Sequence, residues 1–425
     1  MSASSTHESI DVDALRVGMF VHLDLGWMSH PFPLGSFKIA SDDQIATIRQ
    51  LGLKRVRWNP AQSDAEPQAA AAATPGPTDA DGTRPAEAPI EAPAFVERRR
   101  KLALQRAALA ACERQFSEAA RECRRATELV ATQPSAAASH AEALSRALVD
   151  KMVGDQDLCI RLLTDAAGDK ASAHALNVAI ISLLMGRAFG LSDGDMLDLG
   201  VGALMHDIGK LDVPDRVRHR EEHFSAAENR FYEEHVQFGV AHARKMGLSA
   251  GATRVIAQHH EHADATGFPQ RLNVDRMTPQ ARIVSLVNRY DNLCNPHVPS
   301  RAMTPHEALS LLFAQSKTRY DTGILGAFIK MMGVYPPGSV VQLTDDRFAM
   351  VVGVNSTRPL KPRVLVHEAG VPRDEALVVD LETVAGLGIR RSVKPLQLPD
   401  ASLAYLSPRP RVAYFFEPAR DAEAA

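Results

Sequence analysis

The sequence of 425 residues is poor in cysteine, in aromatic residues and in net charge, and these shortages exclude several classes of protein. Its four cysteines are Cys112, Cys123, Cys159 and Cys294. None of them forms a Cys-x-x-Cys pair, which argues against a disulfide framework and against a thiolate zinc site. Any metal must therefore be held by histidine and carboxylate.

Charge and hydrophobic runs are equally limited. There are 48 Lys and Arg residues against 51 Asp and Glu, and the net charge of −3 provides no field for binding duplex nucleic acid. The longest apolar run, residues 178–186, is too short to span a membrane. The N-terminus lacks the layout of a signal peptide. We expect a cytoplasmic protein without a membrane or duplex nucleic acid as partner.

The sequence pattern changes several times along the chain and predicts a mainly α protein with five segments. Residues 9–60 indicate a small α+β domain, and residues 61–93, rich in Ala and Pro, indicate a disordered linker. Residues 94–140 predict a long connecting helix, and residues 141–333 predict an all-helical catalytic domain. Short alternating runs over residues 334–410 predict a β-rich C-terminal appendage.

A seven-residue repeat of apolar side chains marks the long helix. Its members are Leu102, Leu109, Phe116, Cys123 and Val130. The positions between them are weak for a coiled coil: Gln105, Cys112, Ala119 and Ala126. Two interpretations stay open, namely a helix packed on its own domain and a homodimer seam along residues 94–130.

Histidines and acids interrupt apolar helical segments between residues 174 and 291. His206 and Asp207 follow the apolar run 199–205, and a buried His-Asp pair needs a reason. On a helix, adjacent side chains point about 100° apart, so His206 can bind one metal while Asp207 bridges to a second. Further candidate ligands are His174, His235, His259 and His260. The pattern predicts a two-metal site.

Two metals suit hydrolysis at phosphorus. Cations about 3.5 to 4 Å apart lower the pKa of a shared water and neutralise charge on the phosphoryl oxygens. Lys210 follows His206 by one helical turn and can hold a phosphate oxygen, the alternative being a lysine that extends to solvent. Imidazole and carboxylate ligands without thiolate favour Fe or Mn, with Zn as the remaining alternative.

These motifs, in this order, resemble the HD-GYP subgroup of the HD-domain metal-dependent phosphohydrolases. They are His174-x-x-Asn177, His206-Asp207-Ile208-Gly209-Lys210, His235-x-x-x-Gly239, His259-His260-Glu261 and Asp264 to Pro269. The resemblance covers about residues 140–355, and residues 9–60 are similar to a domain of unknown function that often precedes HD-GYP domains. It implies an all-α domain that uses two or three metals to hydrolyse cyclic di-GMP to linear pGpG or GMP.

Position by position, the resemblance implies a set of site residues. The metal ligands are His174, His206, Asp207, His235, His259 and His260, with Asn288 at the position of a further ligand. Asp207 and Lys210 take the catalytic roles. The substrate contacts are Lys210, Gly267, Phe268, Pro269 and Arg301.

The sequence also departs from the family pattern. Asn288 replaces an aspartate and should weaken the second metal. An Arg-Pro-Tyr-Arg/Lys run that holds phosphates is absent, with Arg301 next to its place. Lys170 replaces the glutamate of a third metal, which argues against a trinuclear centre. Ala265 replaces a glycine, so a loop that needs positive φ there must change shape.

These departures leave three hypotheses. The first is an active cyclic di-GMP phosphodiesterase with two divalent metals. The second is a weakened module that binds cyclic di-GMP, or a diguanylate cyclase domain, without efficient hydrolysis. The third is another phosphohydrolase activity, such as nucleotide dephosphorylation.

Overall fold

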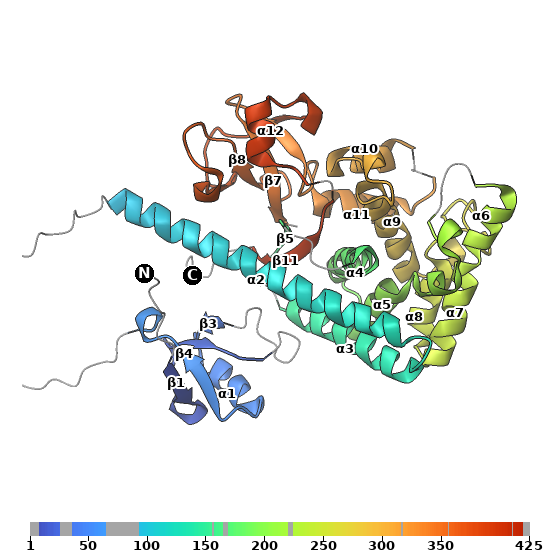
Figure 1. The fold of residues 1–425 in the computed structure, drawn as a ribbon, viewed down its shortest axis with the longest axis horizontal. Coiled ribbons are helices and arrows are strands. Elements are labelled where there is room, and N and C mark those ends of the chain that lie inside the picture. The colour runs from blue at the N-terminus through green and yellow to red at the C-terminus, as the bar shows by residue number, and fades with distance from the viewer. Residues whose placement is uncertain are drawn as a thin grey trace, which may run out of the picture. The chain divides into compact units, whose positions relative to one another are not determined.

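The computed structural model describes residues 8–25, 36–64, 93–154, 157–164, 169–219, 224–315, 318–355, 357–409 and 411–419. The chain divides into two compact units, Met1–Leu104 and Gln105–Ala425. Most of the predicted linker, residues 65–92, lies outside the described residues. The predicted fold class is confirmed: the chain contains a helical HD-type domain, a small N-terminal α+β unit and a C-terminal sheet (Figure 1).

The N-terminal unit has a four-stranded antiparallel sheet in the order β1-β4-β2-β3. Its elements are β1 (Glu8–Asp11), β2 (Phe20–His22), β3 (Ser36–Lys38), α1 (Asp42–Gln50) and β4 (Arg55–Trp58). Apolar side chains from the sheet and from α1 form a separate core that includes Val21, Ile48 and Val56. The unit reaches beyond residue 60, because the Asp64 amide bonds the Gly18 carbonyl at 2.9 Å.

The predicted helix over residues 94–140 is wrong at its C-terminal end. Helix α2 spans Pro93–Leu129, and a second helix, α3 (Pro134–Met152), starts at a proline and returns along it. His140 of α3 bonds Glu122 of α2 at 3.0 Å. Gln133 precedes a proline and is disfavoured in a helical conformation, which explains the break.

The second half of α2 packs on its own chain. Four of its small or apolar residues are at most 1% exposed: Phe116, Ala119, Cys123 and Ala126. These residues belong to the predicted homodimer seam and are already buried within one chain. The homodimer prediction along 94–130 is therefore wrong for this half, and the alternative of a helix packed on its own domain holds there.

Helix α4 (Lys170–Ala188) is the central helix of the helical domain, and 13 of its 19 residues are buried. It packs against α5 (Asp193–Met205) and α9 (Pro279–Cys294). Helix α5 contacts α3 and α8 (Ala250–Gln258), and α8 contacts α7 (His235–Met246). Among the described residues, α4 is the helix long and apolar enough to cross a membrane, but 72% of that window is buried inside the structure.

The strands of the C-terminal sheet come from two parts of the sequence, one before α4 and one after α9. Its strands are β5 (Leu158–Leu162), β6 (Val340–Leu343), β7 (Phe348–Asn355), β8 (Arg363–Val366), β9 (Val378–Asp380), β10 (Ile389–Ser392) and β11 (Tyr414–Pro418). The order is β10-β6-β7-β5-β11, with β8 on β7 and β9 on β8. The predicted boundaries of 334–410 are therefore too narrow, since β5 comes from the segment predicted as helical and β11 follows residue 410.

Shorter elements complete the second unit. They are α6 (Ala226–Glu233), α10 (Pro305–Gln315), α11 (Thr322–Met332), α12 (Asp400–Leu406) and the 3-10 turn η4 (Ile208–Asp212). Turn η4 packs against α7, the contact that brings the His206-Asp207 pair to His235.

Candidate metal centre

Helix ends bring six of the predicted ligands together. His174 lies in α4, His206 and Asp207 follow α5, and His235 is the first residue of α7. His259 and His260 directly follow α8. The side chains form two groups that share Asp207: His174, His206 and Asp207, and Asp207, His235, His259 and His260. Within each group the potential ligand atoms lie within 4.8 Å of one another.

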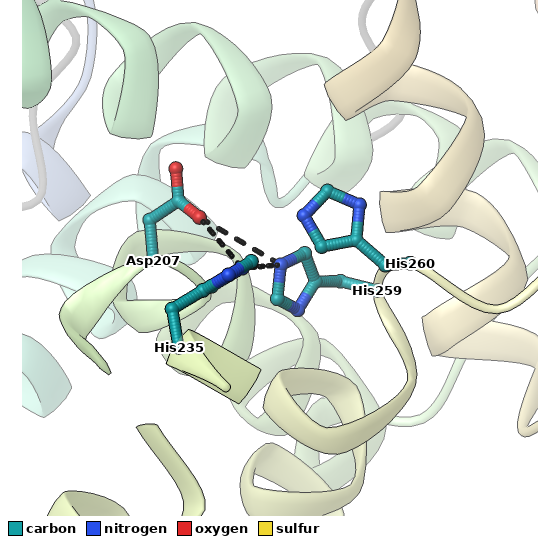
Figure 2. Close-up of side chains that lie close together, drawn as sticks. All are labelled: Asp207, His235, His259 and His260. Atoms are coloured by element: carbon teal, nitrogen blue, oxygen red, sulfur yellow. Dashed lines mark hydrogen bonds and ion pairs between the residues drawn. The ribbon is translucent and has the colours of Figure 1, made fainter. Parts of the chain in front are cut away.

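Asp207 is the residue that the two groups share, and Figure 2 shows it facing His235 and His259 of the second group. Its Oδ2 lies 3.5 Å from His206 Nε2 and 3.8 Å from His174 Nε2. Its Oδ1 lies 3.6 Å from His235 Nε2 and 3.7 Å from His259 Nε2. The expectation that Asp207 lies on a helix is wrong, because α5 ends at Met205 and Asp207 stands in the turn before η4. The turn directs one carboxylate oxygen to each group of histidines.

Backbone carbonyls fix the tautomers of three histidines. His206 Nδ1 donates to the Ala203 carbonyl at 2.7 Å, and His259 Nδ1 donates to the Ile256 carbonyl at 2.8 Å. His235 Nδ1 donates likewise to the Tyr232 carbonyl. A neutral imidazole that donates from Nδ1 has a lone pair on Nε2. All three Nε2 atoms are therefore available as ligands.

The site fits a cation because lone pairs face one another without a proton between them. The Nε2 atoms of His235 and His259 are 3.4 Å apart, and those of His174 and His206 are 3.2 Å apart. Burial lowers the pKa of His206 and of His235 to about 3, so both rings are neutral at pH 7. Asp207 Oδ1 is buried without a hydrogen-bond partner. Divalent cations on these atoms would satisfy all of them.

Lys210 lies beside Asp207 and is not a solvent-extended lysine. Its Nζ is 2.6 Å from Asp207 Oδ2, and its side chain is 19% exposed. Burial alone would raise the pKa of Asp207, but the Lys210 ammonium and the imidazoles hold that pKa well below its usual range. Asp207 is therefore a carboxylate at neutral pH. The Nζ of Lys210 also lies 5.7 Å from the ring centre of Tyr232.

The predicted substrate loop packs against the second group of histidines. The Phe268 ring stacks on His260 with centroids 4.5 Å apart and planes at 24°. Gly267 is buried, and a Cβ there would lie 2.4 Å from the His262 backbone nitrogen. Only glycine fits at this position. The peptide bond between Phe268 and Pro269 is cis.

Ala265 has a backbone conformation that non-glycine residues rarely adopt. Its φ is 61°, in the left-handed region. The position therefore has positive φ, and alanine adopts it. The loop is held by Glu261, whose carboxylate accepts from the amides of Gln270 at 2.6 Å and Leu272 at 2.8 Å. This carboxylate anchors the C-terminal end of the loop.

Asn288 and Arg301 are two further predicted site residues. Asn288 is buried on α9, but its Oδ1 accepts from Asn292 Nδ2 at 2.6 Å. Arg301 ends a short 3-10 turn, Pro299–Arg301, and is exposed. The roles of Asn288 as ligand and Arg301 as phosphate contact stay proposals.

Two residues of the site are not among the candidates predicted from the sequence. Asp291 Oδ2 accepts from His174 Nδ1 at 2.6 Å, which fixes the tautomer of the fourth histidine. Tyr232 supplies the carbonyl that binds His235 and the ring beside Lys210. Asp291 had a signal in the sequence, since it is an acid inside an apolar helical segment.

Comparisons with known proteins agree with this geometry. Residues 157–324 match the model of the HD domain, and residues 7–141 match a domain of unknown function, DUF3391. A cyclic di-GMP phosphodiesterase, PA4108 of Pseudomonas aeruginosa, is 29% identical over 371 residues, 84% of each chain. The 3'3'-cGAMP-specific phosphodiesterase 3 of Vibrio cholerae is 28% identical over 174 residues, 41% of this chain and 38% of that one.

Among solved structures, Bd1817, a HDG"Y"P protein from Bdellovibrio bacteriovorus, is 14% identical, with a TM-score of 0.40 over 76% of this chain and 98% of that chain. The family models identify an HD domain over residues 157–324, preceded by a DUF3391 domain over residues 7–141. Together with the ordered motifs, they confirm the predicted resemblance to the HD-GYP subgroup.

Proposed function

We propose that the protein is a metal-dependent phosphodiesterase that hydrolyses cyclic di-GMP to linear pGpG or GMP. The observation that carries this proposal is the position of Asp207 between two groups of histidine Nε2 atoms. The relatives in Pseudomonas and Vibrio, named for cyclic di-GMP and 3'3'-cGAMP, support a cyclic dinucleotide as substrate. Roles for individual residues follow from the geometry.

Two divalent metals at this site would supply a hydroxide nucleophile and neutralise charge on the phosphoryl oxygens. His174 and His206 would hold one metal, and His235, His259 and His260 the other, with Asp207 shared. Lys210 is placed to bind a phosphate oxygen, and its ion pair with Asp207 keeps its ammonium at the site. The stacked pair of Phe268 and His260 provides an apolar surface beside the substrate.

The metals are proposed to be Fe or Mn, with Zn as the alternative. The described ligands are imidazole and carboxylate, and all four cysteines are free and buried elsewhere. Asn288 would be a neutral further ligand that weakens one site.

A second function is favoured by Asn288 in particular. Its amide oxygen already accepts a hydrogen bond from Asn292, and a neutral amide replaces a carboxylate. A weakened site suits a sensor that binds cyclic di-GMP, or a module that binds a diguanylate cyclase domain. In this alternative the cluster binds metal and dinucleotide but turns over slowly.

Product formation distinguishes the two functions. We expect protein loaded with Mn(II) or Fe(II) under anaerobic conditions to release linear dinucleotide from cyclic di-GMP, and Asp207→Ala to release none. Asn288→Asp should raise the rate or the metal occupancy. Binding of cyclic di-GMP without product would support the sensor function, and full activity of Asp207→Ala would overturn the proposed site.

We propose a cytoplasmic location, in keeping with four free cysteines, and neither duplex nucleic acid nor a membrane as partner. A homodimer would use the first half of α2, where Phe95 and Val96 are each 51% exposed. Light scattering tests this assembly, and Phe95→Glu should convert a dimer to a monomer.

A further inference from the structure

Asp291 is a buried carboxylate held by three donors. Its Oδ2 accepts from His174 Nδ1 at 2.6 Å. Its Oδ1 accepts from the side-chain amides of Asn177 and Asn295, each at 2.8 Å. The Asp291 side chain is 2% exposed. Because both oxygens are engaged, the carboxylate has one orientation, and it sets the plane of the His174 ring.

The two asparagines are in turn bound by the backbone of the C-terminal strand segment. Asn177 Nδ2 donates to the Val412 carbonyl at 3.0 Å, and its Oδ1 accepts from the Tyr414 amide at 3.0 Å. Asn295 Nδ2 donates to the same Val412 carbonyl at 2.9 Å, and its Oδ1 accepts from the Val412 amide at 2.9 Å. These contacts fix which way each amide faces, with Nδ2 toward Asp291.

This segment leads into the sheet at Tyr414, the first residue of β11. Strand β11 pairs with β5 in an antiparallel register that sets Tyr414 opposite Leu162. Strand β5 precedes α4, the helix that carries both His174 and Asn177. Residues 412–414 therefore bind, from the far end of the sequence, the two asparagines that hold Asp291.

We propose that residues 412–414 are a positioning element of the metal centre, acting on His174 through Asn177, Asn295 and Asp291. The C-terminal appendage then does more than cover the helical domain, because it completes the support of one ligand. The inference rests on the proposed metal site. It predicts that replacing either asparagine lowers the affinity for a metal at the group of His174, His206 and Asp207. This loss should exceed what any loss of folding stability explains.

The experiment compares two variants that differ in their link to Asp291. Asn295→Ala removes a donor to Asp291 and both bonds to Val412. Tyr290→Phe, the matched control, lies beside Asp291 on α9 and loses a hydrogen bond to the same strand, at 3.2 Å to the Tyr414 hydroxyl. Both changes remove a polar contact between the C-terminal end of α9 and residues 412–414. Only the first touches the support of His174.

Mn(II) alone is the probe, titrated into metal-free full-length protein by calorimetry and electron paramagnetic resonance. We expect Asn295→Ala to lose about tenfold or more in affinity at one Mn(II) site, the size usual for a change behind a metal ligand. Tyr290→Phe should stay within about twofold of wild type. Thermal unfolding of each variant measures the separate effect on stability.

Equal Mn(II) affinity of Asn295→Ala and Tyr290→Phe would overturn the inference. Wild-type protein that binds no Mn(II) would instead overturn the proposed metal site, so the two failures are distinct. If Asn295→Ala does not fold, the inference is tested on the wild-type protein by the protonation of His174. In ¹⁵N-histidine spectra of the Zn(II)-loaded form, we expect His174 to keep its Nδ1 proton and bind through Nε2. Metal bound at Nδ1 would contradict the role of Asp291.

Discussion

Gly209 lies where turn η4 crosses the start of α7, and its replacement by alanine should distort the metal centre. A Cβ at Gly209 would lie 1.8 Å from the His235 carbonyl oxygen and 2.4 Å from the Gly239 nitrogen. Real Cβ contacts are not shorter than 3.0 Å, so two backbone segments must separate by at least about 1 Å. Overpacking of this kind costs about 1–3 kcal/mol of folding stability.

The same separation moves Asp207 away from His235, which begins α7. Their ligand atoms are 3.6 Å apart, so a shift of about 1 Å is large on the scale of a metal site. We expect Gly209→Ala to lower the urea midpoint and to bind Mn(II) at least about tenfold more weakly than wild type.

Two other glycines provide a graded comparison. A Cβ at Gly239 would lie 3.0 Å from the Ile256 side chain and in ordinary contact, 3.5 Å, with the Gly209 nitrogen, and a Cβ at Gly194 meets nothing within 4 Å. Gly239→Ala should therefore have a smaller effect, and Gly194→Ala should bind Mn(II) like wild type. If Gly209→Ala binds Mn(II) as tightly as Gly194→Ala, the close approach of η4 to α7 does not control the site.

Three further predictions concern stability. Ala265→Gly should stabilise the protein by up to about 1 kcal/mol in urea, since relief of φ 61° outweighs the entropy of glycine; a less stable variant would contradict this. Burial lowers the pKa of Lys151 from 10.5 to about 8, so the unfolded state binds more protons between these values and the contribution of Lys151 to stability rises with pH. Urea unfolding should therefore show Lys151→Met more stable than wild type at pH 7, by up to about 3 kcal/mol, with the gap narrowing by pH 10; a constant gap would refute the shift. Chelation of bound metal should lower the unfolding temperature of wild type but not of Asp207→Ala, because a ligand at 100 times its Kd contributes about 2.7 kcal/mol.

Local patterns predicted much of this fold and most of the candidate site. The spacing of apolar residues predicts α2, and buried histidines next to acids indicate the cluster around Asp207. These signals are local, because each ligand lies at or near the end of an apolar helix. Such a helix must bury its apolar side chains against other helices. The close packing of those helices then brings the ligands together.

Other features depend on contacts between distant residues and have weak local signals. Strand β5 is a run of five buried residues whose sequence is equally typical of a buried helix. It pairs with β7 and β11, which include Asn355 and Tyr414 and lie far along the chain. Asp291 is 117 residues from His174 in sequence, so its bond to that ring follows only from the packing of α4 on α9. The end of α2 did have a local signal, Pro134, which begins the next helix.

The most direct test of the account is the magnetic state of the Mn(II)-loaded protein, because the central claim is that Asp207 is shared by two metals. Electron paramagnetic resonance should show two Mn(II) ions per chain, coupled to each other, and Asp207→Ala should lose the coupling. A spectrum of one isolated Mn(II) ion in the fully loaded wild-type protein would contradict the two-metal centre.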